Sequence, residues 1–386
     1  MKRYALVPIL LGFFAMGFAD IVGTVLNQVT AECRLSAKVA GFLPSMIFIW
    51  FLLVSVPAGL LSARFGRRNT CLLALGVTAA AMFLGGMGGP SCVWVYFVVF
   101  AFLGIGNTVL QAALPALLSN VTASGKLTSR LTLGQFVKAI CAALTPVFVW
   151  IASTTFGNWK LLFPLYGGLT LVATMTLLVV PIPREERREG GGATFRGSLA
   201  LLADPRILAL ALGVFASVAV DVGFNISVPD ILAGRYRLSR DAAGMGPTVF
   251  FVAKTLASFA GAFLFARVLP VRCFPWTVAL ALVGTLVAGF APTPQTFLAA
   301  VFVASLGLGN TFGICFGQAI AHRPDRTDEV SSLMVMAISG GAVMSVALGL
   351  AQSGFGLAGQ FAVLLVPIAY LGILSFAESR RRVGVR

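Results

Sequence analysis

The chain consists mainly of a succession of apolar runs, many of them close to the length that crosses a lipid bilayer. A helix needs about 20 predominantly apolar residues to span the hydrocarbon core, so these runs indicate transmembrane helices. Hydrophobic residues make up 58% of the 386 and charged residues only 11%, which is too little polar surface for a soluble protein of this size. The sequence therefore predicts an all-α membrane protein embedded in a lipid bilayer. We place twelve helices at 5–29, 39–62, 70–88, 92–120, 129–153, 161–182, 206–232, 243–267, 273–291, 295–321, 328–353 and 358–378.

The longest polar stretch lies near the middle of the chain, between Pro183 and Pro205. It contains the charged run from Arg184 to Glu189 and then three consecutive glycines, whereas the other loops are short. This stretch divides the predicted helices into two sets of six. We therefore expect an amino-terminal six-helix bundle over residues 1–182, a linker over 183–205 and a carboxy-terminal six-helix bundle over 206–386.

The basic residues between the helices are divided unevenly between the two sides of the membrane. If the amino terminus lies inside, the inner segments hold 20 Lys and Arg residues, the outer loops hold 6, and the remaining two of the 28 lie within helices. Because cytoplasmic loops carry the excess of positive charge, we expect both termini and the linker in the cytoplasm. The expected location is the plasma membrane, the inner membrane of a bacterium. The net charge of +15 then reflects orientation, and no nucleic-acid partner is expected.

Residues that would support other kinds of chemistry are scarce. The six cysteines are scattered and His322 is the single histidine, so neither a disulfide framework nor a histidine metal site is expected. No phosphate-binding loop follows Gly104-x-Gly106 and no Walker sequence is present, so neither a dinucleotide nor ATP is expected to bind. No nucleophile–base combination is visible either. The sequence therefore predicts a protein without enzymatic activity, cofactor or metal.

The two halves of the chain share a repeated pattern. The fourth predicted helix contains Leu-Gly-Ile-Gly-Asn-Thr at 103–108, and the tenth contains Leu-Gly-Leu-Gly-Asn-Thr at 306–311, an offset of 203. Asp20 on the first helix and Asp221 on the seventh lie 201 residues apart, and an asparagine follows each. Gly-rich apolar helices resemble one another without duplication, but Asp and Asn are costly in lipid. A parallel repeat of two pseudo-symmetric bundles places a solute site near the midplane, between the halves.

Polar side chains within the predicted helices indicate which helices line that site, because such groups must be paired or face water. They are concentrated on the first, fourth, seventh and tenth helices, whereas the third, sixth and ninth carry no Asn, Gln or charged residue. Amides donate and accept hydrogen bonds, as a sugar requires, but they also bond helices together. The candidate solute-binding residues are the amides Asn27, Asn107, Gln111, Gln135, Asn225 and Asn310, the lysines Lys138 and Lys254, and Trp50, whose ring either stacks on a sugar or packs in the core.

Two carboxylates are candidates for proton coupling. Asp20 lies roughly 22 Å along the first predicted helix at ~1.5 Å per residue, and is therefore expected within the hydrocarbon core. Such a group either takes a proton from one side and releases it to the other, or forms a fixed ion pair with Lys138 or Lys254. Asp221 on the seventh helix has the same two interpretations. The lysines correspondingly either contact solute or only neutralise the aspartates.

The stretch Gly59-Leu-Leu-Ser-Ala-Arg-Phe-Gly-Arg-Arg68 resembles the signature loop of the major facilitator superfamily, with Ala63 where that family has an acidic residue. The resemblance implies the major facilitator fold, with twelve transmembrane helices in two pseudo-symmetric six-helix bundles. The missing acidic residue removes the usual ion pair between this loop and a helix.

Within that superfamily the chain is similar to the fucose:proton symporter branch of sugar permeases. The matching residues are Asp20, the run Arg-Leu-Thr-Leu-Gly-Gln at 130–135 and the basic Lys254. The resemblance implies that Asp20 serves proton coupling and sugar binding, and that Gln135 binds sugar. Lys138 stands where the branch has Asn, and Leu110-Gln111 lacks the branch's acidic coupling residue on the fourth helix. Asp221 compensates for that missing carboxylate in our hypothesis.

The sequence as a whole predicts a secondary transporter that imports a small hydrophilic solute, a sugar, by alternating access with proton symport. We expect it to work as a monomer whose partners are the solute and protons. The alternatives that remain are a sugar uniporter, a proton-driven exporter of amphipathic compounds, and a sensor that binds solute without transporting it.

Overall fold

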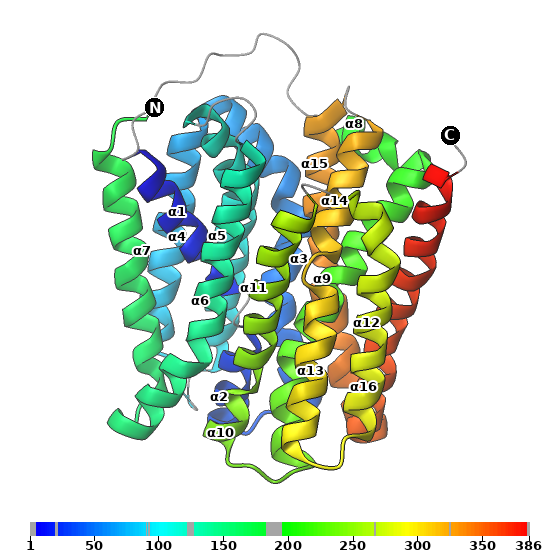
Figure 1. The fold of residues 1–386 in the computed structure, drawn as a ribbon. Coiled ribbons are helices and arrows are strands. Elements are labelled where there is room, and N and C mark those ends of the chain that lie inside the picture. Colours follow the sequence, from blue (N-terminus) through cyan, green and yellow to red (C-terminus); the bar gives the residue numbers. More distant parts are fainter. Residues whose placement is uncertain are drawn as a thin grey trace.

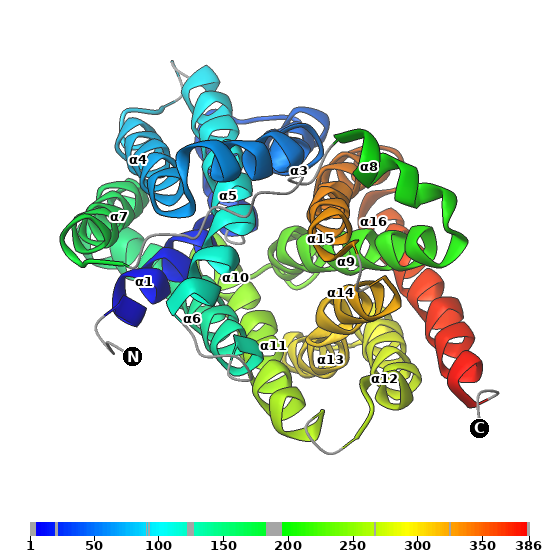
Figure 2. The same ribbon diagram turned by 90° about the horizontal axis from the view of Figure 1, so that it is seen from above.

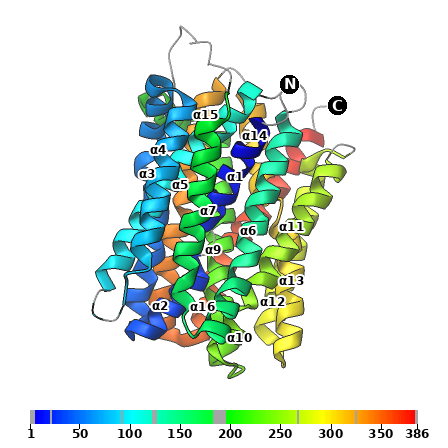
Figure 3. The ribbon, with the colours of Figure 1, turned by 90° about the vertical axis from the view of Figure 1, so that its left-hand side faces the viewer.

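The computed structural model describes residues 5–19, 22–89, 91, 93–121, 127–182, 195–265, 268–323 and 326–383. These described parts are helical and contain no β-strand, as the apolar runs predict. Long helices run from one end of the molecule to the other (Figure 3). The α-helices are α1 (Leu6–Met16), α2 (Val22–Cys33), α3 (Ala37–Phe65), α4 (Arg67–Gly85), α5 (Val93–Val121), α6 (Leu127–Phe156), α7 (Leu162–Val179), α8 (Phe195–Ala200), α9 (Pro205–Gly234), α10 (Arg240–Gly244), α11 (Gly246–Leu264), α12 (Pro270–Phe290), α13 (Pro294–Leu308), α14 (Thr311–His322), α15 (Thr327–Met336) and α16 (Gly340–Val383).

Most of these helices are long and apolar enough to cross a membrane. In the described part of the chain nine spans meet this test, and a tenth is added if the bent pair Leu6–Ala19 and Thr24–Cys33 counts as one. The last span, Ser332–Arg380, contains a break at Gly356, where φ is +62°, and its two arms run side by side (Figure 1). Helix α11 packs lengthwise against α6 and α13. The arrangement agrees with the twelve helices predicted from the sequence.

Several helices begin where the sequence supplies a capping side chain and a proline. At the start of α9 the Asp204 carboxylate accepts a hydrogen bond from the Arg206 backbone N–H at 2.9 Å, and Pro205 occupies the first helical position. At the start of α13 the side chains of Thr293 and Thr296 form a reciprocal capping box. Such caps satisfy backbone donors that a helix end leaves unpaired, so they fix where these helices begin.

The helices form two groups that lie side by side when viewed along the bundle (Figure 2). Helices α1–α7 make up one group and α9–α16 the other. The main contacts between the groups pair α3 with α16 and α6 with α11. The start of α1 and the end of α16 lie at one end of the bundle, which we call the terminal end, and the end that carries α10 is the distal end (Figure 1).

Helices differ in how much of their apolar surface is covered. In α9, 72% of the most apolar window is buried, compared with 33% in α12. Trp276, Val287 and Phe290 on α12 are largely exposed, as are Val172 and Val179 on α7. Exposed apolar surface of this extent suits contact with lipid. The polar seventh predicted helix therefore lies inside the bundle, and the purely apolar sixth and ninth lie at its surface.

The structure differs from the predicted segments at several places. The first predicted helix, 5–29, is divided into α1 and α2, with a 3-10 turn at Gly17–Ala19, and the eleventh, 328–353, is divided between α15 and α16 by a 3-10 turn at Ala337–Ser339. The tenth predicted helix is broken between Leu308 and Thr311, so that it consists of α13 and α14. The predicted linker contains the short helix α8, and the short helix α10 precedes α11. Hydropathy did not detect these features because it identifies long apolar runs, and it reveals neither a break inside such a run nor a helix of only five or six residues.

Candidate functional site

An ion pair joins the seventh and eighth predicted helices inside the carboxy-terminal group. Lys254 Nζ on α11 donates to Asp221 Oδ2 on α9. The side chains are only 25% and 18% exposed, so each charge depends on the other for compensation. The structure therefore brings together one predicted proton-coupling residue and one predicted solute-binding residue.

The other predicted carboxylate, Asp20, lies outside the described residues. The chain just before it is described, and packs closely on α6. A Cβ atom at Gly17 would lie 2.7 Å from the backbone oxygen of Lys138. Lys138 itself is half-buried on α6. The first predicted helix therefore approaches α6 at the level of this lysine.

Trp50 and Asn107 lie on adjacent helices of the amino-terminal group. A Cβ atom at Gly104 on α5 would lie 2.7 Å from Trp50 Cδ1 on α3, so the indole fits against α5 only because position 104 is glycine. Asn107 follows Gly104 by about one helical turn and is 5% exposed. Gly104 of the first Gly-x-Gly-Asn sequence thus makes room for the Trp50 ring, about one helical turn before Asn107 on α5.

In the amino-terminal group, three predicted binding residues have buried polar atoms without a partner among the described residues. Within the described chain, Asn27 Nδ2, Trp50 Nε1 and Asn107 Oδ1 are buried and have no hydrogen-bond partner. They come from three different helices, α2, α3 and α5. Because most buried polar atoms in proteins are hydrogen-bonded, such atoms are expected to bind water or a ligand.

The amides of the carboxy-terminal group lie on α9 and at the break between α13 and α14. Asn225 is buried on α9, one turn after Asp221. Asn310 lies at the break between α13 and α14, where its Nδ2 donates to the Ala257 backbone oxygen at 2.9 Å. Gly261 leaves the space that the Asn310 amide occupies, since a Cβ atom there would lie 2.4 Å from its Oδ1. Asn310 therefore bonds helices together, which is the second role considered for these amides.

The two predicted glutamines lie nearer to the surface. Gln111 on α5 is half-buried and Gln135 on α6 is exposed. No described hydrogen bond connects either of them to another predicted site residue. The structure thus leaves the sugar-binding role of Gln135 as a prediction.

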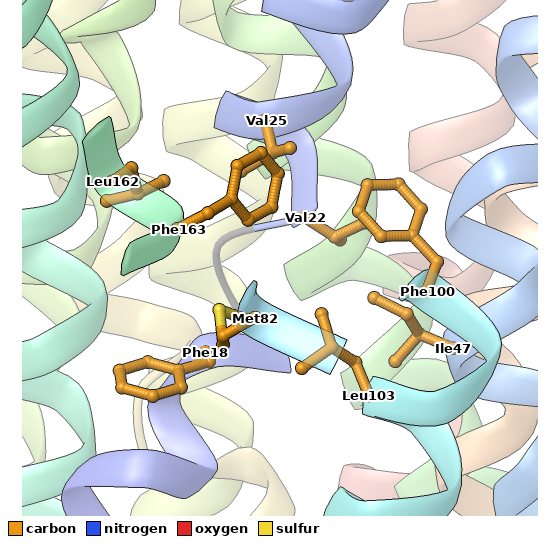
Figure 4. A pocket seen from close by; sticks show the side chains of 9 residues that line it. All are labelled: Phe18, Val22, Val25, Ile47, Met82, Phe100, Leu103, Leu162 and Phe163. Atoms are coloured by element: carbon orange, nitrogen blue, oxygen red, sulfur yellow. The ribbon is translucent and has the colours of Figure 1, made fainter. Parts of the chain in front are cut away.

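A small cavity lies within the amino-terminal group, between α2, α3, α4, α5 and α7 (Figure 4). Its lining is entirely apolar: Phe18, Val22, Val25, Ile47, Met82, Phe100, Leu103, Leu162 and Phe163. A cavity without polar partners does not hold water or a hydrophilic solute. We therefore interpret it as a packing gap and not as part of the site.

The structure also shows charged contacts that sequence reasoning missed. Glu32 on α2 accepts from Lys160 Nζ at 2.6 Å and from Trp159 Nε1 at 2.9 Å. Arg68, in the signature loop, donates to the backbone oxygens of Leu177 and Leu178 at the end of α7. An arginine in this place satisfies carbonyls that a helix terminus leaves unpaired. The loop that lacks an acidic residue is thus attached to α7.

A further group of charges gathers at the terminal end. Arg206 donates to both carboxylate oxygens of Glu378, at 3.1 and 2.6 Å, and His322 lies between Arg206 and Asp204. Burial alone would raise the pKa of Asp204, but hydrogen bonds from the Arg206 backbone and His322 outweigh it and hold that pKa below its ordinary value. The four side chains connect α9, α14 and α16.

Asp230 and two glutamines form another polar contact, at the distal end. Asp230 lies on α9, and Gln360 on α16 donates to its Oδ2 at 3.0 Å. An acidic residue inside the predicted helix 206–232 was a visible signal, but its partner lies 130 residues away, so the pairing was not predictable.

Comparisons with known proteins agree with this architecture. The sequence profile of the Major Facilitator Superfamily matches residues 9–345. Among curated relatives, the uncharacterized transporter YycB of Bacillus subtilis (strain 168) is 28% identical over 177 residues, which are 45% of this chain and 42% of YycB. The nitrite extrusion protein of the same organism is 23% identical over 297 residues, covering 75% of this chain and 72% of that protein.

Solved structures share the fold at low sequence identity. A bacterial homologue of the human lysosomal transporter Spinster, inward-facing and occupied, has a TM-score of 0.78 at 14% identity, covering 98% of this chain and 97% of its own. A single-residue variant of the E. coli fucose:proton symporter, FucP, has a TM-score of 0.70 at 18% identity, covering 98% of both chains. The predicted superfamily is thereby confirmed: the chain is an integral membrane transporter that belongs to the Major Facilitator Superfamily.

Proposed function

We propose that this transporter moves a small hydrophilic solute, a sugar, together with protons, by alternating access between its two helix groups. The superfamily assignment supports a small-molecule solute without naming it. The observation that favours a sugar is the set of unpartnered buried atoms Asn27 Nδ2, Trp50 Nε1 and Asn107 Oδ1. They offer two donors and one acceptor, and sugar hydroxyls both accept and donate.

Asp20 and Asp221 are the proposed proton-coupling residues. Asp221 has Lys254 as its partner, so a proton that arrives at Asp221 would release the lysine to contact solute. Asp20 has the position of the coupling aspartate in the fucose:proton symporter branch. The remaining proposed solute contacts are Gln111, Gln135, Lys138 and Asn225, with Asn310 in a supporting role.

The proposed orientation places the terminal end in the cytoplasm of a bacterium and the distal end outside the inner membrane. It rests on the excess of basic residues in the segments at the terminal end. The protein works as a monomer in this proposal, because each chain contains both helix groups.

A second candidate function is the transport of a small inorganic anion. The observation that favours it is the relative named as a nitrite extrusion protein, which aligns over 75% of this chain. A lysine within the membrane would suit an anion, but the carboxylate of Asp221 offsets the charge of Lys254. We therefore place this candidate second.

The test is uptake into proteoliposomes of labelled monosaccharides and, separately, of nitrite, with and without an inward proton gradient. A sugar that accumulates above equilibrium only with the gradient supports the proposal. A sugar that equilibrates without concentrating identifies a uniporter. Movement of nitrite but of no sugar would replace the proposal with the second candidate, and movement of neither would favour the exporter or the sensor.

A further inference from the structure

Asp230 lies on the buried helix α9, close to the distal end of the molecule. It precedes the last residue of the helix, Gly234, by four positions, which is about 6 Å at ~1.5 Å per residue. The side chain is half-buried. The carboxylate therefore lies about one helical turn from the distal end of α9 and is only partly covered by protein.

The partners of Asp230 are two glutamines on α16. Gln360 Nε2 donates to its Oδ2 at 3.0 Å, and the side chain of Gln352 also hydrogen-bonds to it. Gln352 and Gln360 lie on opposite sides of Gly356, where the two arms of α16 meet. Asp230 therefore holds both arms of this helical hairpin against α9.

A glutamine partner and a lysine partner differ in which protonation state of an aspartate they can stabilise. Lys254 can only donate, so it stabilises Asp221 as an anion. A glutamine amide donates to a carboxylate through Nε2 and accepts from a carboxylic acid through Oε1. Gln360 is fully buried, and within the described chain its Oε1 has no hydrogen-bond partner. After a half-turn of the amide this oxygen would accept a hydrogen bond from the O–H of a protonated Asp230, so the site accommodates both forms.

Other charged groups at the distal end have partners of their own or lie on the short helix α10. Glu32 binds Lys160, and Arg235 donates to the Gly289 backbone oxygen at 2.7 Å. Arg240 and Asp241 are adjacent opposite charges on α10. Among the side chains that the structure describes, several further titratable or charged groups lie on α9 or on elements packed against it. On and beside α9 they are Asp204, Arg206, Asp221, Tyr236 and Arg237. On the neighbouring elements they are Cys33 on α2, Lys254 on α11, Cys315, His322 and Arg323 at α14, Glu329 on α15, and Tyr370, Glu378 and Arg380 on α16.

The first arm of α16 also forms a close contact between the two helix groups, with α3. Ser45 Oγ on α3 lies 2.8 Å from Ser345 Oγ and donates to the Ala342 backbone oxygen at 3.2 Å. A Cβ atom at Gly41 would lie 3.2 Å from the Gly349 Cα atom, so the two backbones nearly touch. We call this contact the distal gate. Gln352 follows Gly349 by one helical turn, so Asp230 holds the arm immediately beyond the gate.

We propose that Asp230 is a proton-binding residue that controls the distal gate. In the closed gate described here, Asp230 accepts hydrogen bonds from both glutamines, as a carboxylate does. Protonation replaces these charge-assisted bonds with weaker neutral ones and leaves one glutamine less firmly held. The hairpin is then released from α9, and the gate between α3 and α16 opens. Acidity on the distal side therefore favours opening. The inference extends the proposed proton coupling, on which its role in transport rests.

The test measures the distal gate directly and needs no solute. The native cysteines are replaced by serine, nitroxide labels are attached to Val39→Cys on α3 and Ser353→Cys on α16, and the distance distribution is recorded in lipid nanodiscs between pH 5 and 8. We expect the longer, open distance to gain population as pH falls. One linked proton changes the open-to-closed ratio by up to about tenfold per pH unit.

Variants identify the group that titrates. Asp230→Asn is neutral at every pH and should show a mostly open, pH-independent gate, whereas Asp230→Glu should restore the pH response. Gln360→Met should raise the open population at pH 8, and Asp241→Asn, a distal carboxylate outside the hairpin contact, should behave like the parent. A pH response that survives in Asp230→Asn, or a parent gate that ignores pH, would overturn the inference.

Transport measurements separate this inference from the proposed function. If a proton gradient drives sugar uptake equally well in the parent and in Asp230→Asn, the proposed function stands and the inference fails. If a proton gradient does not drive sugar uptake but the distal gate still responds to pH through Asp230, the inference about Asp230 stands and the proposed symport is wrong.

Discussion

Individual polar residues inside this bundle differ in what they can do because their partners differ. Asp221 has a lysine partner and Asp230 has amides, while Asn27 and Asn107 retain buried atoms without a partner among the described residues. A lysine partner stabilises the ionised form of a carboxylate, whereas a glutamine partner can bind either the ionised or the protonated form. A buried polar atom without a protein partner is available to bind a ligand. Chemical role therefore follows from the neighbour as much as from the residue type.

The Asp221–Lys254 pair gives a prediction at this scale. Lys254→Met removes the cationic partner of a partly buried carboxylate, and should lower the free energy of unfolding by about 1–3 kcal/mol, less than the ~3–5 kcal/mol of a fully buried pair. The double variant Asp221→Asn/Lys254→Met should recover most of this loss. Thermal unfolding in detergent micelles measures both. Equal destabilisation in the single and double variants would show that the lysine acts through packing alone.

Asp20 gives a second prediction, for a substitution that removes the charge of the side chain but keeps its shape. Asp20→Asn should abolish accumulation of solute against a gradient while exchange at equilibrium continues, because a neutral amide cannot carry the proton. Concentrative uptake and counterflow in proteoliposomes measure the two activities separately. Accumulation at the parent level in this variant would remove Asp20 from the coupling scheme.

At the scale of elements, close helix crossings depend on missing side chains. On α5, Gly104 allows α3 to approach so closely that an added Cβ atom would lie 2.3 Å from the Ile47 backbone oxygen. On α4, a Cβ atom at Gly76 would meet nothing within 4 Å. Glycine is therefore required at the first position and not at the second.

These two glycines form a matched pair for mutation. Gly104→Ala forces α3 away from α5 and should destabilise the protein by about 1–3 kcal/mol, with reduced uptake because Trp50 is displaced. Gly76→Ala should be neutral or stabilising by up to ~1 kcal/mol, since alanine is the better helix former. Thermal unfolding of both variants, together with uptake, provides the comparison. A neutral Gly104→Ala would mean that the α3–α5 crossing adapts.

The cap of α9 gives a prediction that depends on pH. The folded-state pKa of Asp204 lies below its ordinary value of 3.8, so its charge contributes stability above that value and the contribution is lost as pH falls through the folded pKa. Asp204→Ala should cost about 1 kcal/mol through loss of the cap. Asp204→Asn keeps a capping oxygen and removes only the charge, so the loss of stability relative to the parent should be full at pH 7 and smaller at pH 3, and it should disappear only below the folded pKa of Asp204. Unfolding curves of both proteins at pH 7 and pH 3 test whether the loss shrinks as the pH falls.

The sequence predicted helices better than it predicted contacts. The predicted helix 92–120 corresponds to α5, and 206–232 corresponds to α9, because membrane-spanning runs stand out in hydropathy. The break at Gly309–Asn310 was not foreseen, since the same Gly-Asn sequence continues as helix at Gly106–Asn107. Pairing was also undecided: Lys254 was a possible partner of either aspartate, and only the packing of α9 on α11 selects Asp221.

At the scale of the whole molecule, two helix groups meet along α3–α16 and α6–α11, while α9 is the most enclosed of the long spans. The solute-binding candidates are shared between both groups, so a solute between them would be contacted from each side. This is the arrangement that alternating access requires. Relative motion of the groups then changes which end of the molecule is open.

The contact between Ser45 and Ser345 has an energetic consequence for that motion. Hydroxyl groups that separate on opening exchange one hydrogen bond for bonds to water, and the net difference is only about 0.5–1.5 kcal/mol. The open and closed populations are therefore expected to be comparable, so that a few kcal/mol from a bound solute or proton suffices to reverse them.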